Sequence, residues 1–248
     1  MRRLLTPTFP AALAVALLTA ATSAQDSAEP PAGPIATDAA PSREPAPEAD
    51  RHPDLVRLSP KEEVWIDRKR KEVVVGGKIA LAHGPIEVFA CPAGTKDHEA
   101  IVATKSSARL VHAGLLVLGI DPGRPASFIP IFAPAQGPVI DLRLRWRDAE
   151  GQEHERPARE LIRNHTTGEE LDTDWVFVGS QFWRDPESGR EIYQADGGEL
   201  VCVSNFPEAM LDLPIESSPE NGDLLFEAFE GRVPPTGTAV ELVFSAKR

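Results

Sequence analysis

One cysteine and two histidines lie close together in the middle of the chain, and these residue types often carry covalent or metal chemistry. They are Cys91, His98 and His112. A cysteine beside a histidine can act as a nucleophilic dyad, and three such side chains can hold a zinc ion. The His-Glu pair at 98–99 begins like a zinc-binding helix, but position 102 is valine where that motif needs histidine. We therefore favour a strand, a turn and a helix that contain these residues without a metal.

Carboxylates form a second set of candidates, and Asp174 and Asp196 are the two that we consider for acid–base catalysis. Aspartates also occur at positions 172 and 185. Asp185 and Asp196 lie in turn sequences, where aspartate is favoured because its side chain bonds to the backbone. The spacing of the four carboxylates matches no calcium-binding loop. The sequence thus predicts neither a metal nor another cofactor.

Three further signals have structural alternatives. Cys91 and Cys202 both lie in apolar strand-like segments, so they can form a disulfide in an oxidising compartment or remain two buried thiols. Ser180 lies in Val-Gly-Ser-Gln-Phe and lacks the second glycine of a hydrolase elbow. A group of aromatic residues can form a platform for a sugar or can be buried in a sheet, which is the commoner outcome; the group comprises Trp175, Phe182, Trp183 and Tyr193.

The first 24 residues have the three-part pattern of a secretory signal peptide. A basic start, Met1-Arg2-Arg3, precedes an apolar run over 11–21, and small residues follow at 22–24. This run is shorter than the roughly 20 residues that a membrane-spanning helix requires. We predict a soluble exported protein, periplasmic or extracellular, without an integral membrane anchor after cleavage. The arginine pair leaves the general and the twin-arginine export routes open.

The rest of the chain divides into a spacer and one domain. Residues 25–53 are rich in proline, alanine and acids, with Ile35 as the single large aliphatic residue, so we expect a disordered spacer. Residues 54–248 number 195, enough for one domain with a substantial core. This domain has a formal net charge of −10. Such a charge repels phosphate backbones, so we expect neither nucleic acid nor anionic lipid as a partner.

The pattern within the domain predicts a β-rich α+β fold of antiparallel strands and hairpins. Strands are expected on both sides of a charged turn at 67–70, and Gly76-Gly77 suggests a tight turn or a bulge. Residues 139–161 resemble a hairpin. Residues 174–206 resemble a three-stranded meander with glycine-containing turns.

One main helix is expected at about 107–118. Ser106 or Ser107 can cap its start, and Gly119 can end it. At 100° per residue, His112 falls opposite the apolar face, on a flank that we expect to be solvated. The expected apolar face comprises Leu110, Val111, Gly114, Leu115, Val117 and Leu118.

Several segments together resemble the YdjY-like domain of exported bacterial proteins, an uncharacterised family. They are "EVFACPAGTKDHEAIV", "VHAGLLVLGIDPG", "DWVFVGSQFW" and "ADGGELVCVSNF" with "AMLDLP". The resemblance covers most of residues 60–246 and implies an exported context, but it implies no reaction. Some proteins under that name are linked with iron–sulfur chemistry, yet two cysteines cannot supply the usual four thiolates.

These observations favour a non-catalytic binding or structural module of the cell envelope or the extracellular space, with an unidentified partner. The alternative is a small hydrolase or a metal-dependent enzyme that uses Cys91, His98 and His112, with Asp174 or Asp196. A polar cleft that joins the cysteine and the histidines would favour the enzyme. Dispersed, exposed histidines would favour the module.

Overall fold

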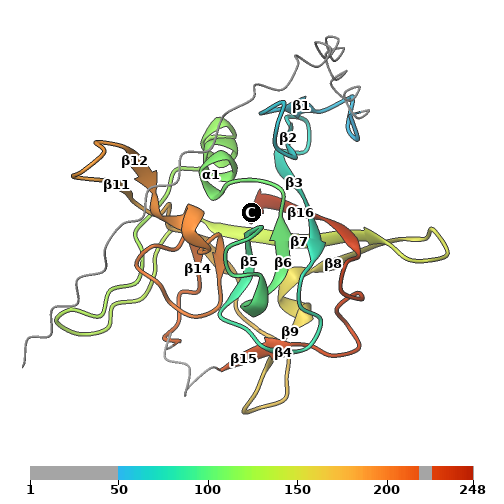
Figure 1. The fold of residues 1–248 in the computed structure, drawn as a ribbon. Helices are drawn as coiled ribbons and strands as arrows, with labels where there is room; N and C mark the ends of the chain where they lie inside the picture. Colours follow the sequence, from blue (N-terminus) through green and yellow to red (C-terminus); the bar gives the residue numbers. More distant parts are fainter. Residues whose placement is uncertain (1–49, 218–224, 248) are drawn as a thin grey trace, which may run out of the picture. The chain divides into compact units, whose positions relative to one another are not determined.

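The computed structural model describes residues 50–217 and 225–247, which form a β-rich domain with one α-helix (Figure 1). The proposed signal peptide and most of the proposed spacer lie outside these residues. The helix is α1 (Ala108–Val117), and three short 3₁₀ helices are η1 (Asp97–Glu99), η2 (Ala158–Leu161) and η3 (Gln194–Gly197). None of these described helices is long and apolar enough to cross a membrane.

The strands of the described residues belong to three sheets. The large sheet consists of β1 (Val56–Arg57), β2 (Val64–Asp67), β3 (Glu72–Ile79), β5 (Val88–Pro92), β6 (Ala100–Thr104), β7 (Val139–Arg147), β8 (Glu153–Pro157), β10 (Trp175–Phe177), β13 (Val201–Cys202), β14 (Leu211–Asp212) and β16 (Ala239–Ala246). The two small sheets consist of β4 (Gly84–Pro85), β15 (Phe226–Ala228) and β9 (Ile162–Asn164), and of β11 (Phe182–Arg184) and β12 (Glu191–Tyr193).

Eight strands of the large sheet close into a ring in the order β3, β16, β7, β10, β14, β13, β5 and β6. The ring closes because β3 has two partners along one edge: β2 pairs with its first half and β6 with its second half. β16 pairs along the other edge of β3. The prediction of a β-rich fold with one main helix is confirmed. Most pairs are antiparallel as expected, but β5–β6 and β13–β14 are parallel.

The segment that follows Cys91 explains one of the parallel pairs. Pro92 ends β5, and Gly94 has a φ of 84°, which glycine adopts without strain. The backbone N–H of Gly94 donates to Oδ1 of Asp97 at 2.8 Å, and η1 then leads into β6 at Ala100. The turn after Pro92 and the return to the sheet at Ala100 are confirmed. The compact turn places β6 beside β5 and parallel to it. The alternation of apolar and polar residues in the sequence does not by itself indicate this parallel pairing.

The inside of the ring is filled by the main hydrophobic core. Its largest fully buried members include Phe89, Ile101, Leu115, Ile140, Leu144, Trp175, Phe177 and Phe244. Gly76 and Gly77 were expected in a turn or a bulge, but they lie inside β3. A Cβ on Gly77 would lie 2.8 Å from the carbonyl oxygen of Ala103. Gly77 therefore permits the close approach of β6.

The helix prediction is confirmed, with one error in the expected face. Oγ of Ser107 accepts a hydrogen bond from the N–H of Leu110 at 3.4 Å, so Ser107 is the N-cap. Val111 and Leu115 are fully buried, whereas Val117 is 57% exposed. Val117 lies two residues beyond Leu115, which at 100° per residue places it on the opposite side of the helix. The expected apolar face was therefore too wide.

The first described residues lie on the domain, although composition assigned 50–53 to the spacer. Nε1 of Trp65 donates to Oδ1 of Asp50 at 2.8 Å. Nε2 of His52 lies 2.7 Å from Oε1 of Glu241. These contacts hold the segment against the outer face of the sheet, where Trp65 is buried. Polar residues without an apolar pattern can thus be ordered by their hydrogen bonds to a strand.

Candidate functional site

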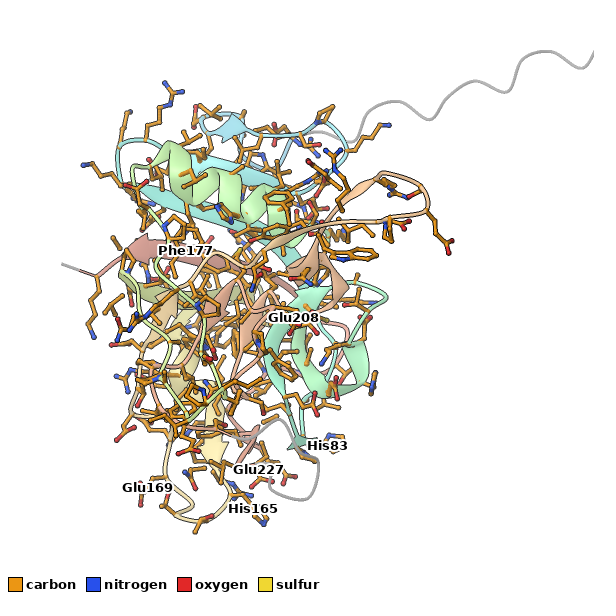
Figure 2. The ribbon with its side chains drawn as sticks, turned by 90° about the vertical axis from the view of Figure 1, so that its left-hand side faces the viewer. His83, His165, Glu169, Phe177, Glu208 and Glu227 are labelled. Atoms are coloured by element: carbon orange, nitrogen blue, oxygen red, sulfur yellow. The ribbon has the colours of Figure 1, made fainter. Side chains whose placement is uncertain are left out.

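The structure does not assemble the cysteine–histidine cluster. Cys91 is buried on β5, the side chain of His98 on η1 is 77% exposed, and His112 on α1 bonds to Tyr193. Within residues 50–217 and 225–247, no three His, Cys, Asp or Glu side chains are arranged to hold a metal ion. Figure 2 shows His83 and His165 at the opposite end of the domain from α1. The separate positions of Cys91, His98 and His112 support the interpretation that each of them has its own structural role.

Both cysteines lie in an environment that suppresses thiolate formation. Burial raises the pKa of Cys91 to about 11, and its Sγ lies 3.7 Å from Oδ1 of Asp97. Burial raises the pKa of Cys202 well above its usual value. Since the thiolate is the nucleophile and the metal ligand, neither side chain is activated at neutral pH. Both are free thiols in the structure, and a disulfide between them stays a prediction.

His112 is a half-buried structural residue, so the prediction of a solvated flank is wrong. Its Nδ1 lies 2.7 Å from the hydroxyl of Tyr193, which donates to the carbonyl oxygen of Gly179 at 2.9 Å. The imidazole also packs edge-on against Phe177, with the ring centroids 5.0 Å apart. Burial lowers the pKa of His112, which favours the neutral ring. The sequence separation of 81 residues between His112 and Tyr193 explains the error, because the helix alone gives no sign of this neighbour.

The carboxylate candidates are also engaged in structural contacts. Oδ1 of Asp196 accepts a hydrogen bond at 3.0 Å from the backbone N–H of Arg109, in the first turn of α1. Asp174 forms an ion pair with Lys247. Asp185 accepts from the N–H of Glu187 at 2.9 Å within the β11–β12 turn. Asp172 and Asp174 lie in the segment before β10, Asp185 in the β11–β12 turn and Asp196 in η3. No three of these carboxylates are arranged to hold a metal ion among the described residues.

Sequence reasoning missed an ion cluster around Lys96. Its Nζ lies 3.1 Å from Glu87, 3.2 Å from Glu99 and 3.4 Å from Glu199, and it lies over the ring of Phe206. Burial alone would lower the pKa of Lys96, but the hydrogen bond to Glu87 and the nearby negative charges raise it. The cluster fixes the turn after β5 onto the segment before β13. A single lysine in a polar turn gives no local signal of such a role.

Large apolar side chains are exposed at the tip of the segment between α1 and β7. We call residues 124–136 the apolar loop; bridges between Arg124 and Gln136 and between Ser127 and Ala133 make it hairpin-like. Ile129 is 87% exposed and Ile131 76% exposed. No charged residue lies between Arg124 and Asp141 in the sequence. Side chains of this kind are seldom exposed side by side without a binding role.

The base of the apolar loop is tightly held although its tip is exposed. Ala126 and Ala135 are buried in an outer cluster that also contains Val176 and Val178. The N–H of Gly123 donates to the carbonyl oxygen of Phe177 at 2.9 Å. A Cβ on Gly123 would lie 1.9 Å from the carbonyl oxygen of Gln136, so glycine is required where the two arms of the loop meet.

A second apolar projection, the aromatic hairpin (residues 181–194), carries β11 and β12. Its cross-strand pair Trp183 and Ile192 is 47% and 40% exposed, and Phe182 is 59% exposed. Of the four aromatic residues considered for a platform, Trp175 and Tyr193 are buried and the other two are exposed. The apolar loop and the aromatic hairpin extend from the same side of the domain, on the left in Figure 1.

Two anchors hold the base of the aromatic hairpin. One is the hydrogen bond between His112 and Tyr193 described above. The other is Ser180, whose φ of 52° is unusual for a residue other than glycine. Its hydroxyl donates to the carbonyl oxygen of Glu208 at 2.6 Å and accepts from the N–H of Ala195 at 3.1 Å; Glu208 is labelled in Figure 2. His112 and Ser180, which were considered for catalysis from the sequence, therefore hold the exposed aromatic hairpin in position.

We expect His112→Ala to destabilise the domain by about 1–2 kcal/mol, because it removes a partly buried hydrogen bond and packing against Phe177. His98→Ala is the matched control and should change the free energy of unfolding by less than about 0.5 kcal/mol. Urea denaturation at pH 8 measures both. Because the folded pKa of His112 is lowered, its contribution is complete above its unfolded value of 6.5 and declines as the pH falls. Equal losses in the two variants would contradict the anchoring role.

Comparison with known proteins adds a family and no activity. A family model described as the YdjY domain matches residues 64–245. No curated protein and no solved structure matches the chain. The matched residues contain α1, the apolar loop, the aromatic hairpin and all of the closed ring except Ala246, the last residue of β16.

Proposed function

The chain belongs to the YdjY domain family, and we propose that it is an exported, non-catalytic binding module that docks on a partner protein through the apolar loop and the aromatic hairpin. The observation that carries this proposal is the exposure of Ile129 and Ile131, 87% and 76%, on a loop with a buried base. The signal-like start of the chain supports export.

The free energy available at these tips is sufficient for specific recognition. Complete burial of an isoleucine contributes about 1.5–3 kcal/mol, and the two isoleucines of the apolar loop are almost fully available for it. Phe182 and Trp183 add aromatic surface, and tryptophan is enriched among residues that dominate binding energy. Since both projections are held at their bases, little conformational entropy is lost when a partner binds them.

A protein is a better partner than an anionic bilayer for this surface. The domain has a net charge of −10, which opposes approach to anionic lipid. The enzyme alternative has less support, because Cys91 is a buried thiol and His98 and His112 point to different surroundings. The projecting tips fit a partner with an apolar groove or pocket.

A photo-crosslinking experiment tests this function in cells that produce the protein naturally. A photoreactive benzoylphenylalanine at position 129 should give a discrete protein adduct upon irradiation. Adding Ile131→Asp to the same chain should remove at least about nine tenths of the adduct, because a buried unpaired carboxylate costs several kcal/mol.

The matched control places the same photoreactive residue at Val56, which is 44% exposed on β1. This position should not give the adduct. Absence of an adduct at position 129, attachment to lipid alone, or an equal adduct at position 56 would contradict the proposed function. Circular dichroism of each variant separates loss of binding from loss of folding.

A further inference from the structure

A groove with a volume of about 930 Å³ lies on the outer face of β7 and β16, on a different part of the surface from the apolar loop. The segment at Arg51 and His52 and the strand β8 contribute to its walls. Its volume is within the range of about 300–1,000 Å³ that is typical of ligand sites. Five arginines line it: Arg51, Arg70, Arg143, Arg145 and Arg147.

Three of these arginines form a ladder along β7. Arg143, Arg145 and Arg147 occupy alternate positions, so they share the outer face and follow each other at about 7 Å. Nη2 of Arg143 lies 2.6 Å from Glu72 and its Nη1 2.7 Å from Glu155. Arg145 also pairs with Glu155. Nε of Arg143 lies 3.1 Å from Asp141, so each nitrogen of this guanidinium has a carboxylate neighbour. These contacts fix the floor of the groove, and the N–H groups that are not directed at a carboxylate are left for a ligand, since each arginine has five donors.

The arginines at the edges of the groove are free to exchange partners. Arg70 has no carboxylate within ion-pair distance among the described residues. Arg51 is 41% exposed and lies 3.3 Å from Glu63, and Arg147 pairs with the exposed Glu153. Exposed pairs of this kind contribute little to stability. A ligand anion can therefore replace them at little cost.

The charge of the surrounding surface also favours an anion. The β2–β3 turn, which contributes Arg70, carries four consecutive basic residues at 68–71, within a domain whose net charge is −10. The lining of the groove holds these five arginines and four glutamates, Glu72, Glu153, Glu155 and Glu241, so it is slightly basic within an acidic domain. A local excess of positive charge favours an anion at this place. A long polyanion would meet the acidic surface beyond the groove and be repelled, so a short oligoanion fits best.

We propose that this groove binds an oligoanion that carries two or more carboxylate or phosphate groups along a short extended backbone. Arginine suits both groups because its planar guanidinium donates two parallel hydrogen bonds to either of them. The spacing of the ladder allows successive anionic groups to contact successive arginines. A uronate oligosaccharide and a short phosphate chain share this chemistry. The site is independent of the partner-binding surface proposed above.

Isothermal titration calorimetry with the full chain tests the site and distinguishes the two sources. The probes are hexagalacturonate, inorganic tripolyphosphate and the neutral maltohexaose, each at 50 and 200 mM salt. At least one anionic probe should bind, with an affinity that falls several-fold at the higher salt because the charges are screened. Maltohexaose should not bind. The anionic probe that binds more tightly shows whether the site prefers a chain of carboxylates, as in a uronate oligosaccharide, or a short phosphate chain.

The double variant Arg70→Glu with Arg147→Glu should weaken the binding of that probe at least about tenfold, since it reverses two charges at the edge of the groove. Arg109→Glu, the same change at an exposed position on α1, is the matched control and should change Kd less than about twofold. The double variant should retain the photo-crosslink at position 129, which separates this site from the partner-binding surface. Absence of binding by both anionic probes, equal binding of maltohexaose, or an unchanged Kd in the double variant would overturn the proposal.

Discussion

Replacing Trp175 with alanine is expected to lower the free energy of unfolding by about 3–5 kcal/mol, as for other fully buried tryptophans. Trp175 is 1% exposed, lies on β10, and packs against Phe89 with ring centroids 5.6 Å apart. Its Nε1 donates to the carbonyl oxygen of Cys202 at 2.7 Å. The substitution therefore leaves a large cavity and a buried acceptor without its donor.

Trp183→Ala is the matched control, because it removes the same side chain from a position that is 47% exposed. We expect this substitution to lower the free energy of unfolding by less than about 1 kcal/mol. Guanidinium denaturation measures both variants. Comparable losses would show that the aromatic hairpin is part of the core and would weaken the proposed binding role of Trp183.

A decline in stability between about pH 4 and pH 7 is the second large effect that we expect, and it originates from Asp212. This residue is fully buried on β14, and burial raises the pKa of its carboxyl from 3.8 to about 7. Oδ1 of Asp212 accepts hydrogen bonds from Nδ2 of Asn205 at 3.0 Å and from the N–H of Leu213 at 2.8 Å. These two bonds offset only part of the free energy that burial of the ionised carboxylate costs.

The sign follows from proton binding. The folded state keeps the proton of Asp212 up to about pH 7, whereas the unfolded state releases it near 3.8, so the folded state binds more protons in this interval. The free energy of unfolding therefore falls as the pH rises, by up to about 4 kcal/mol. Stability is greatest with the carboxyl protonated and is lost as the pH increases through 7.

Urea denaturation of Asp212→Asn between pH 4 and pH 8 checks this expectation. Asparagine keeps the acceptor oxygen without a charge, so the variant should lose most of the decline and be more stable than the native chain at pH 8. Partial burial also raises the pKa of Glu199, which leaves a smaller decline in the free energy of unfolding with the same sign. An identical slope in the variant and the native chain would rule out Asp212 as the source.

The elements that depend on neighbouring residues were predictable from the sequence. Ser107, the apolar spacing at Val111 and Leu115, and Gly119 indicate the helix, because capping and helical periodicity act within a few residues. Pro92 and Gly94 indicate the end of a strand and a turn, because their backbone preferences are intrinsic. The family resemblance was also visible in the sequence, and the match over residues 64–245 confirms it.

The tertiary structure alone decided the closure of the ring and the role of each candidate residue. Closure depends on β3, which pairs with β6 near Gly77, and strand alternation does not identify such partners. His112 is anchored by Tyr193 and Lys96 by Glu199, and each partner lies about 80 or more residues away along the chain. Burial, ion pairing and pKa arise from side chains that folding brings together. They therefore become visible only when the long-range contacts are known.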